Sequence, residues 1–133
     1  MTDHDIDITA RTLYGEARGQ PVEGIIAVAG VIMNRVHAGR YGATPAEVCQ
    51  RPWQFSCWNA NDVNRVIIEH VQPGYNREFD WCQLVASLAI RGLIHDPSGG
   101  ATHYHTKGVA PDWSLGKTPC AVIGDHLFFK DID

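Results

Sequence analysis

Apolar residues recur at intervals of three and four along most of the first 95 residues, which is the period of an amphipathic helix. The clearest case covers residues 22–36 and follows Pro21, a residue that suits the first turn of a helix. Its apolar positions are Val22, Ile25, Ile26, Ala29, Ile32, Met33 and Val36. We predict that this segment is the buried central helix. Gly24 and Gly30 lower its helix propensity, so we expect another helix to pack closely against them.

A shorter helix is predicted before it. Asp7 or Thr9 can cap this first helix, which runs to about Arg18 and stops at Gly19. Its apolar stripe is formed by Ala10, Leu13, Tyr14 and Ala17. Glu16 therefore lies near the C-terminal end of the helix, where the negative end of the helix dipole disfavours a carboxylate and can raise its pKa.

Three more helices are predicted further along the chain. Thr44–Glu47 is a capping box with proline at the first helical position, and it starts a short helix that ends near Cys49. Residues 61–71 and 76–95 show the helical period again. Between them, residues 50–60 form a predicted loop rich in aromatic and amide side chains.

The period changes after residue 100. Residues 102–106 alternate as a strand does, and residues 121–123 and 126–129 flank a turn at Gly124-Asp125, which predicts a hairpin. The fold class predicted is α+β and mainly helical, with a small C-terminal antiparallel β element. At this length, residues 1–133 are expected to form one domain.

Composition narrows the classes of function. The net charge is -4, and no basic run is interleaved with aromatic residues, so no nucleic-acid partner is expected. No apolar run approaches the roughly 20 residues that a membrane span needs, so no membrane insertion is expected. The acidic segment at residues 1–7 lacks the apolar stretch of a secretory signal, so we expect a chain made without a signal peptide.

Four cysteines leave two alternatives open. Cys49, Cys57, Cys82 and Cys120 form no C-x-x-C pair, which argues against a zinc ribbon or a thioredoxin-like site. Cys49 and Cys57 flank a compact loop and can form a disulfide in an oxidising compartment. The other alternative is that all four are small buried apolar side chains.

The candidate chemistry centres on Glu16. A single glutamate at a helix end with apolar neighbours can serve as a proton donor, the first requirement for breaking a glycosidic bond. Three blocks of sequence, in order and at matching spacing, make the chain similar to the SleB-type cell wall hydrolase family. The first block is Tyr14–Arg18 with Gly19, Pro21 and the following Val31–Val36. The second block is Cys49–Trp58. The third block consists of Pro97–Ala101, Tyr104, His105, Pro111, Trp113 and Ile123–Phe128.

The resemblance implies a lysozyme-like or lytic-transglycosylase-like domain that acts on peptidoglycan with Glu16 as general acid and without a cofactor. Residues 54–56, Gln54, Phe55 and Ser56, are candidates for lining a sugar groove, because amides and hydroxyls bond sugar hydroxyls and an aromatic face covers a pyranose. Tyr104, His105 and Trp113 are further candidates for substrate binding. The alternative for Phe55, Tyr104 and Trp113 is a place in the core.

Other residues are weighed against these. His126 is expected to be structural, and Arg35 is expected to tie its helix to a carboxylate. His103 and His105 alternate onto one strand face as two zinc ligands would, but the glutamate mechanism needs no metal and none is predicted. Further acids exist, and none falls in a block with catalytic character. They are Glu23, Glu47, Asp62 and Asp112.

Several functions therefore stay open at the level of sequence. Lytic transglycosylation needs one carboxylate and is preferred. A muramidase that uses water, a zinc-dependent amidase and an inactive wall-binding module are the alternatives. If the target is the cell wall, a chain without a signal peptide needs another route to it. Release by a lysis system, as in phages, is expected, and a fragment cut from a larger exported protein is the alternative. The sequence does not indicate an oligomeric state.

Overall fold

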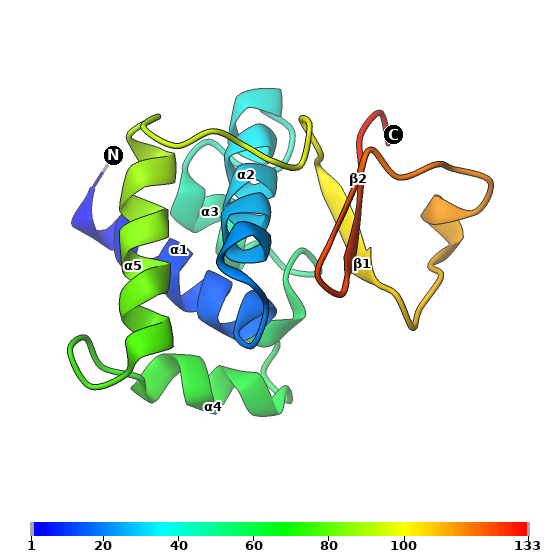
Figure 1. Cartoon of the computed structure of the whole chain (residues 1–133). Coiled ribbons are helices and arrows are strands. Elements are labelled where there is room, and N and C mark those ends of the chain that lie inside the picture. Colours follow the sequence, from blue (N-terminus) through cyan, green and yellow to red (C-terminus); the bar gives the residue numbers. More distant parts are fainter. Residues whose placement is uncertain (1, 133) are drawn as a thin grey trace.

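Within residues 2–132, five α-helices precede a small antiparallel sheet (Figure 1). The computed structural model describes residues 2–132. The helices are α1 (Asp3–Ala17), α2 (Val22–Ala38), α3 (Pro45–Gln50), α4 (Val63–His70) and α5 (Arg77–Ile90), with 3-10 turns η1 (Ser56–Trp58) and η2 (Asp112–Ser114). The strands are β1 (His103–Thr106), β2 (Ala121–Ile123) and β3 (His126–Phe129). The predicted mainly helical α+β class is confirmed. Among the described residues, no helix has the length and apolar character needed to span a bilayer.

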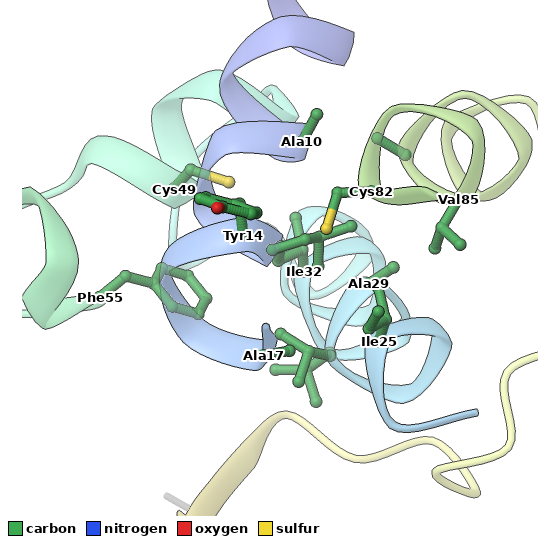
Figure 2. Close-up of a cluster of buried hydrophobic side chains, with 14 of the residues drawn as sticks. Ala10, Tyr14, Ala17, Ile25, Ala29, Ile32, Cys49, Phe55, Cys82 and Val85 are labelled. Carbon is green, nitrogen blue, oxygen red and sulfur yellow. The ribbon is translucent and has the colours of Figure 1, made fainter. Parts of the chain in front are cut away.

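Helix α2 lies at the centre of the helical region, as its apolar pattern predicts. Figure 2 shows Ile25, Ala29 and Ile32 packed against side chains from α1 and α5. Val28 and Ile32 are fully buried, and full burial of such a side chain contributes about 1.5–3 kcal/mol. The helix ends where Gly39 adopts a left-handed backbone, with φ of 80°.

The two glycines of α2 were expected beside another helix, and this prediction is wrong. A side chain at Gly30 would overlap the carboxylate of Asp96, which lies in the loop after α5. A Cβ at Gly24 would lie 3.8 Å from Ile123 of strand β2. Close approach explains both glycines, but their partners are a loop and a strand.

Helix α1 begins about four residues before the predicted cap. Thr2 caps it by accepting a hydrogen bond from the Asp5 backbone at 3.2 Å, and the Asp5 carboxylate accepts one from the Thr2 backbone at 3.0 Å. The same carboxylate accepts a hydrogen bond from the Ala46 backbone at 3.1 Å. Asp5 is therefore buried between α1 and α3, and these bonds lower its pKa against the opposing effect of burial. The Thr2–Asp5 pair is a capping box, which the apolar pattern alone did not indicate.

Helix α5 ends at Ile90, five residues before the predicted end at residue 95. Gly92 has φ of 71°, its backbone donates to Ala89, and the backbone of Leu93 donates to the Leu88 carbonyl. These two bonds define a Schellman motif, which stops the helix. Leu93, predicted on the apolar face, is 61% exposed as a result.

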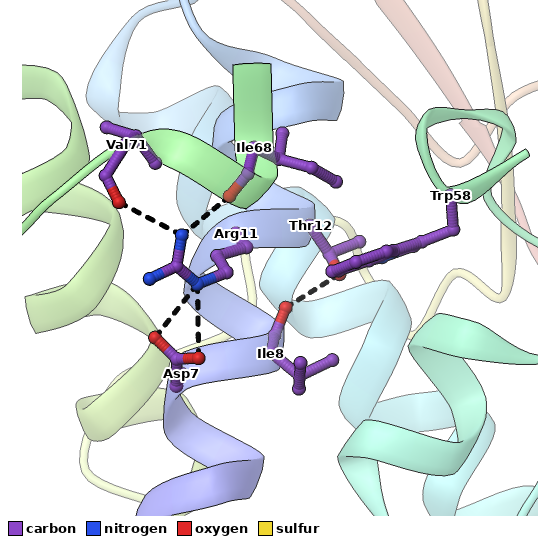
Figure 3. A network of polar contacts seen from close by, with 7 residues as sticks. All are labelled: Asp7, Ile8, Arg11, Thr12, Trp58, Ile68 and Val71. Carbon is purple, nitrogen blue, oxygen red and sulfur yellow. Dashed lines mark hydrogen bonds and ion pairs between the residues drawn. The ribbon is translucent and has the colours of Figure 1, made fainter. Parts of the chain in front are cut away.

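Side chains of α1 hold α4 and η1 in place (Figure 3). Arg11 donates to the backbone carbonyls of Ile68 at 2.6 Å and Val71 at 3.0 Å, and it also pairs with Asp7. Trp58 donates its indole N–H to the Thr12 hydroxyl at 2.9 Å. These contacts hold the end of α4 and the turn η1 against α1.

The strand order in the sheet is β1-β3-β2, and all pairs are antiparallel. Tyr104 lies opposite Phe128, and His105 lies opposite Leu127. Because side chains alternate across a strand, Tyr104 and Phe128 share the face toward the helices, and His103 and His105 lie on the other face. The predicted strand and hairpin are confirmed to within one residue.

Candidate active site

Glu16 lies in the last turn of α1 and is partly buried. The residue before it is a glycine for a steric reason. A Cβ at Gly15 would lie 2.8 Å from the Cβ of Cys57 and 3.0 Å from Ile68, closer than side chains pack. The glycine thus lets η1 pack directly on α1. As a consequence, the loop that carries Gln54 and Ser56 stands beside Glu16.

Tyr104 reaches Glu16 from strand β1. Its phenol donates a hydrogen bond to Glu16 Oε1 at 2.5 Å. Burial raises the pKa of Tyr104 well above its usual value, and the nearby charge of Glu16 raises it further. The phenol therefore keeps its proton at neutral pH and acts as the donor. A hydrogen bond between a phenol and a carboxylate is among the stronger kinds.

Two aromatic rings from β3 hold Tyr104 in place. The His126 ring meets it edge-on with centroids 4.9 Å apart, and the Phe128 ring lies 5.7 Å away. His126 is buried, burial lowers its pKa, and its Nδ1 has no hydrogen-bond partner within residues 2–132. It supports Tyr104 by packing, which agrees with the structural role predicted for it.

Glu16 and Tyr104 line a cavity of about 340 Å³. Its other lining residues are Arg35, Trp53, Gln54, Ser56 and Asn59. Among the described residues that line it, Glu16 is the only carboxylate. A wider hollow of about 730 Å³ lies between the start of α1 and α3, but Glu16 does not reach it. The polar lining around a carboxylate makes the smaller cavity the candidate active site.

Arg35 lines this cavity, is almost fully buried, and has no carboxylate partner within residues 2–132, contrary to the prediction. It donates to the Thr102 carbonyl at 2.7 Å and to Gln54 Oε1 at 2.8 Å. Its guanidinium lies 5.1 Å from the ring centroids of both Tyr41 and Phe55. Burial lowers its pKa, but an arginine stays protonated at neutral pH.

The neighbouring Asn34, and not Arg35, binds a carboxylate. Its side chain donates to Asp96 Oδ2 at 2.9 Å and to the Ala101 carbonyl at 2.8 Å. Asn34 and Arg35 near the end of α2 therefore both anchor the segment that leads into β1. Asn34 bonds the Ala101 carbonyl, and Arg35 bonds the Thr102 carbonyl. Together these bonds set the position of Tyr104.

Trp53 is a cavity residue that the sequence pattern did not single out. It is 90% exposed and has φ of 70°, in the left-handed region that large residues rarely occupy. The Gln54 backbone donates to the Arg51 carbonyl at 3.2 Å, so Pro52 and Trp53 are the central residues of a turn of type II pattern. The third position of such a turn favours glycine. In the sequence, the signal that could have identified Trp53 was the Pro52-Trp53 pair in a polar loop.

The structure brings together only part of the predicted substrate-binding set. Gln54, Ser56 and Tyr104 line the cavity with Glu16. Phe55 is 3% exposed and packs under Arg35, which is the core alternative weighed for it.

His105 and Trp113 do not line the cavity with Glu16. They lie on the far face of the sheet, with ring centroids 5.7 Å apart, and Trp113 also packs edge-on against Phe129 at 5.3 Å. His105 follows Tyr104 directly in β1, so the alternation of the strand turns its side chain away from Glu16.

The histidine and cysteine alternatives can also be placed. His103 and His105 do share a strand face, but His103 packs on Trp113 at 5.1 Å. Within residues 2–132, no group of three or more His, Cys, Asp or Glu side chains converges as metal ligands would. All four cysteines are free thiols, and Cys49, Cys57 and Cys82 are buried. Burial raises the pKa of Cys49 and of Cys82 to about 12, as expected of inert core side chains.

Comparison with known proteins identifies the family of the chain. The family model described as Cell Wall Hydrolase matches residues 19–129. The chain is similar to spore cortex-lytic enzymes of Oceanobacillus iheyensis (32% identity over 97% of this chain) and Halalkalibacterium halodurans (30% over 96%). It spans 42% and 35% of the length of these two curated relatives.

Two solved structures share the fold. The catalytic domain of the Bacillus cereus SleB protein has a TM-score of 0.77 and 29% identity, covering 97% of this chain and 91% of that domain. The catalytic domain of the germination-specific lytic transglycosylase SleB from Bacillus anthracis has a TM-score of 0.76 and 30% identity, covering 98% and 97%.

Proposed function

The chain belongs to the cell wall hydrolase family, and we propose from that premise that it cleaves the glycan strands of peptidoglycan. The bond cleaved joins N-acetylmuramic acid to N-acetylglucosamine, and the reaction is lytic transglycosylation. The observation that carries this proposal is that Glu16 is the only carboxylate among the described residues lining its cavity. A hydrolase that activates water or forms a covalent intermediate needs a second carboxylate near the first.

In the first step, Glu16 donates its proton to the glycosidic oxygen as the bond to the muramic acid C1 breaks. The sugar develops oxocarbenium character and the N-acetylglucosamine leaves as an alcohol. Glu16, now a carboxylate, accepts the proton of the muramic acid 6-hydroxyl while that oxygen attacks C1. The product is a 1,6-anhydro sugar, and Glu16 recovers its proton.

The other cavity residues bind and orient in this scheme. Tyr104 holds the Glu16 carboxyl in one orientation through its 2.5 Å hydrogen bond. Gln54 and Ser56 offer amide and hydroxyl groups to sugar hydroxyls, and the exposed Trp53 indole offers an apolar face to a pyranose ring. Arg35 fixes Gln54 at 2.8 Å, so the amide is already positioned before a sugar arrives.

Muropeptide analysis tests the proposal. Purified sacculi are digested with the wild-type protein and with Glu16→Gln, which keeps the side-chain shape and removes the titrating proton. Mass spectrometry should find anhydromuramyl ends released by wild type, at a rate at least about 10³-fold higher than by the variant. The matched control is Glu23→Gln, which removes the same charge from an exposed residue in the first turn of α2, outside the cavity.

The products separate the remaining alternatives. Reducing muramyl ends would mean that water attacks and the protein is a muramidase. Release of stem peptides with new amino groups, stopped by a chelator, would indicate a zinc-dependent amidase. Binding to sacculi without any release would indicate a wall-binding module. An active Glu16→Gln variant would remove Glu16 from the mechanism.

A further inference from the structure

A second cavity adjoins the one that contains Glu16. It has a volume of about 240 Å³ and is lined by Arg40, Tyr41, Arg51, Gln54 and His103. Gln54 lines both cavities, so the two are neighbours separated by a single side chain. A polymer bound at Glu16 therefore passes within reach of the second cavity, which we name the arginine cavity.

Two guanidinium groups dominate the arginine cavity. Arg40 donates one hydrogen bond to the Ile132 carbonyl at 2.6 Å and lies 5.0 Å from the centroid of the Tyr41 ring. Arg51 donates one to the Arg40 carbonyl at 2.7 Å. A guanidinium has five N–H donors, so these single bonds fix the position of each group and leave donors for a ligand.

Neither arginine is neutralised by an acid within residues 2–132. The ion pairs there are Arg11 with Asp7 and Arg65 with Glu69, both far from this cavity in the fold. What sets Arg40 and Arg51 apart is that both line one cavity. Arginines held in this way match the geometry of a carboxylate or phosphate.

His103 also lines the arginine cavity and lies in the same positive environment. Its pKa is lowered to about 4, first by burial and then by the charges of Arg35 and Arg40. The ring is therefore neutral near pH 7, and its Nδ1 is 2.9 Å from the Thr102 hydroxyl. Near neutral pH the charge of the cavity comes from its arginines.

We propose that the arginine cavity binds a carboxylate of the peptide carried by muramic acid, so that the substrate class is peptide-bearing glycan strands. The assignment rests on the proposed function. On a peptide-bearing strand the hydroxyl and N-acetyl groups of the sugars are uncharged, and the lactyl carboxyl group of muramic acid is joined to the peptide as an amide. The sugars themselves therefore offer no anion to Arg40 and Arg51. A stem peptide attached beside the cleaved bond carries free carboxylates, which two adjacent guanidinium groups recognise.

The test compares soluble uncross-linked glycan strands that keep their stem peptides with the same strands after the peptide carboxyl groups have been converted to amides. For the wild type, we expect kcat/KM to be about tenfold higher on the strands with free carboxylates, the range of one or two charge-assisted hydrogen bonds at an exposed site. In the double variant Arg40→Gln/Arg51→Gln the ratio should fall to about one to two. Arg91→Gln, which changes an exposed arginine at the end of α5, should keep the wild-type ratio.

Each outcome has a distinct meaning. If the wild type cleaves both kinds of strand equally, or if the double variant keeps the tenfold ratio, the peptide assignment is wrong and the proposed function stands. If neither kind of strand is cleaved, the proposed function itself fails. Raised salt should lower the ratio, because the contact is between exposed charges.

A competition experiment needs only the wild-type protein. Free stem peptide should inhibit cleavage of peptide-bearing strands, and the same peptide with its carboxylates amidated should inhibit at least about tenfold less well. Equal inhibition by the two peptides would overturn the assignment. Inorganic phosphate that inhibits as well as the peptide at equal concentration would show a general anion site and would also overturn it.

Discussion

The two faces of strand β1 carry different chemistry although their residues alternate in one short segment. On the helix-facing side, Tyr104 donates to Glu16 and borders a cavity lined by polar side chains. On the opposite side, His103 and His105 pack with Trp113 and Phe129 in a cluster of aromatic rings. The first side leaves polar groups available beside Glu16. On the second side the rings pack against one another, and His103 also lines the arginine cavity.

The same contrast separates two tryptophans. Trp113 is partly buried and contacts three aromatic rings. Trp53 is 90% exposed, and its backbone is in a conformation that glycine would favour. The position of Trp113 is explained by packing. The position of Trp53 is not, and strained exposed residues cluster at functional sites. An aromatic residue that lies close to the site in sequence can therefore contribute to binding only if the fold leaves its ring exposed.

The largest effect expected on the cavity side is that of Glu16→Gln, with activity reduced at least about 10³-fold. Its free energy of unfolding should change by less than about 1 kcal/mol, because the variant keeps an oxygen that accepts from Tyr104. Urea unfolding measures this directly. A loss of several kcal/mol would mean that the inactive variant reports instability instead of chemistry.

Trp113→Ala tests the other face. It removes ring contacts with His103, His105 and Phe129, so we expect the free energy of unfolding to fall by about 2–3 kcal/mol. This loss is somewhat smaller than the loss expected for a fully buried tryptophan. Activity per folded molecule should stay within about twofold of wild type at a temperature where the variant is folded. A fall in kcat of tenfold or more with normal stability would place Trp113 in substrate binding. The two faces of β1 would then not differ in the way described.

Tyr104→Phe tests the link between the two sides. It removes the hydrogen bond to Glu16 and keeps the ring that packs on His126 and Phe128. We expect kcat to fall by about 10- to 100-fold, because the carboxyl group loses its fixed orientation. Tyr14→Phe is the matched control, since its hydroxyl accepts from Asn76 and neither residue lines the cavity. If both variants keep full activity, the Tyr104 hydroxyl has no part in the reaction.

The smallest effect is expected at Trp53, where two variants separate the loss of the indole from the relief of the positive φ. Trp53→Ala and Trp53→Gly both remove the indole, so KM should rise about 5- to 10-fold in each, a loss of roughly 1 kcal/mol of binding. Only glycine also relieves the positive φ, so Trp53→Gly should be up to about 1 kcal/mol more stable than Trp53→Ala. Michaelis–Menten kinetics and urea unfolding measure the two quantities. An unchanged KM would show that the exposed ring does not contact the glycan.

Local signals were sufficient for much of the fold. The hairpin around Gly124-Asp125 and the helix cap at Thr44 were predicted to within one residue, because a turn or a cap is decided by neighbours in the chain. The reciprocal bond of a capping box was not found, since Glu47 accepts from the Ala43 backbone. The end of α5 was missed because the apolar period continues past Gly92, where only the left-handed backbone stops the helix. The start of α1 was missed because its capping box has Asp5 at the position where Glu or Gln is typical.

The sequence by itself determined the helical and strand segments, the α+β class and the place of Glu16 at the end of a helix. It also named Gln54, Ser56 and Tyr104, which the fold brings to that residue. Only the tertiary structure decided which aromatic side chains meet the cavity. Packing of Ile123 and Phe128 into the helical core selects the face of β1 that turns inward, and this contact joins residues about 100 positions apart. The arginine cavity follows for the same reason, because Arg40, Arg51 and His103 become neighbours only after the sheet closes on the helices.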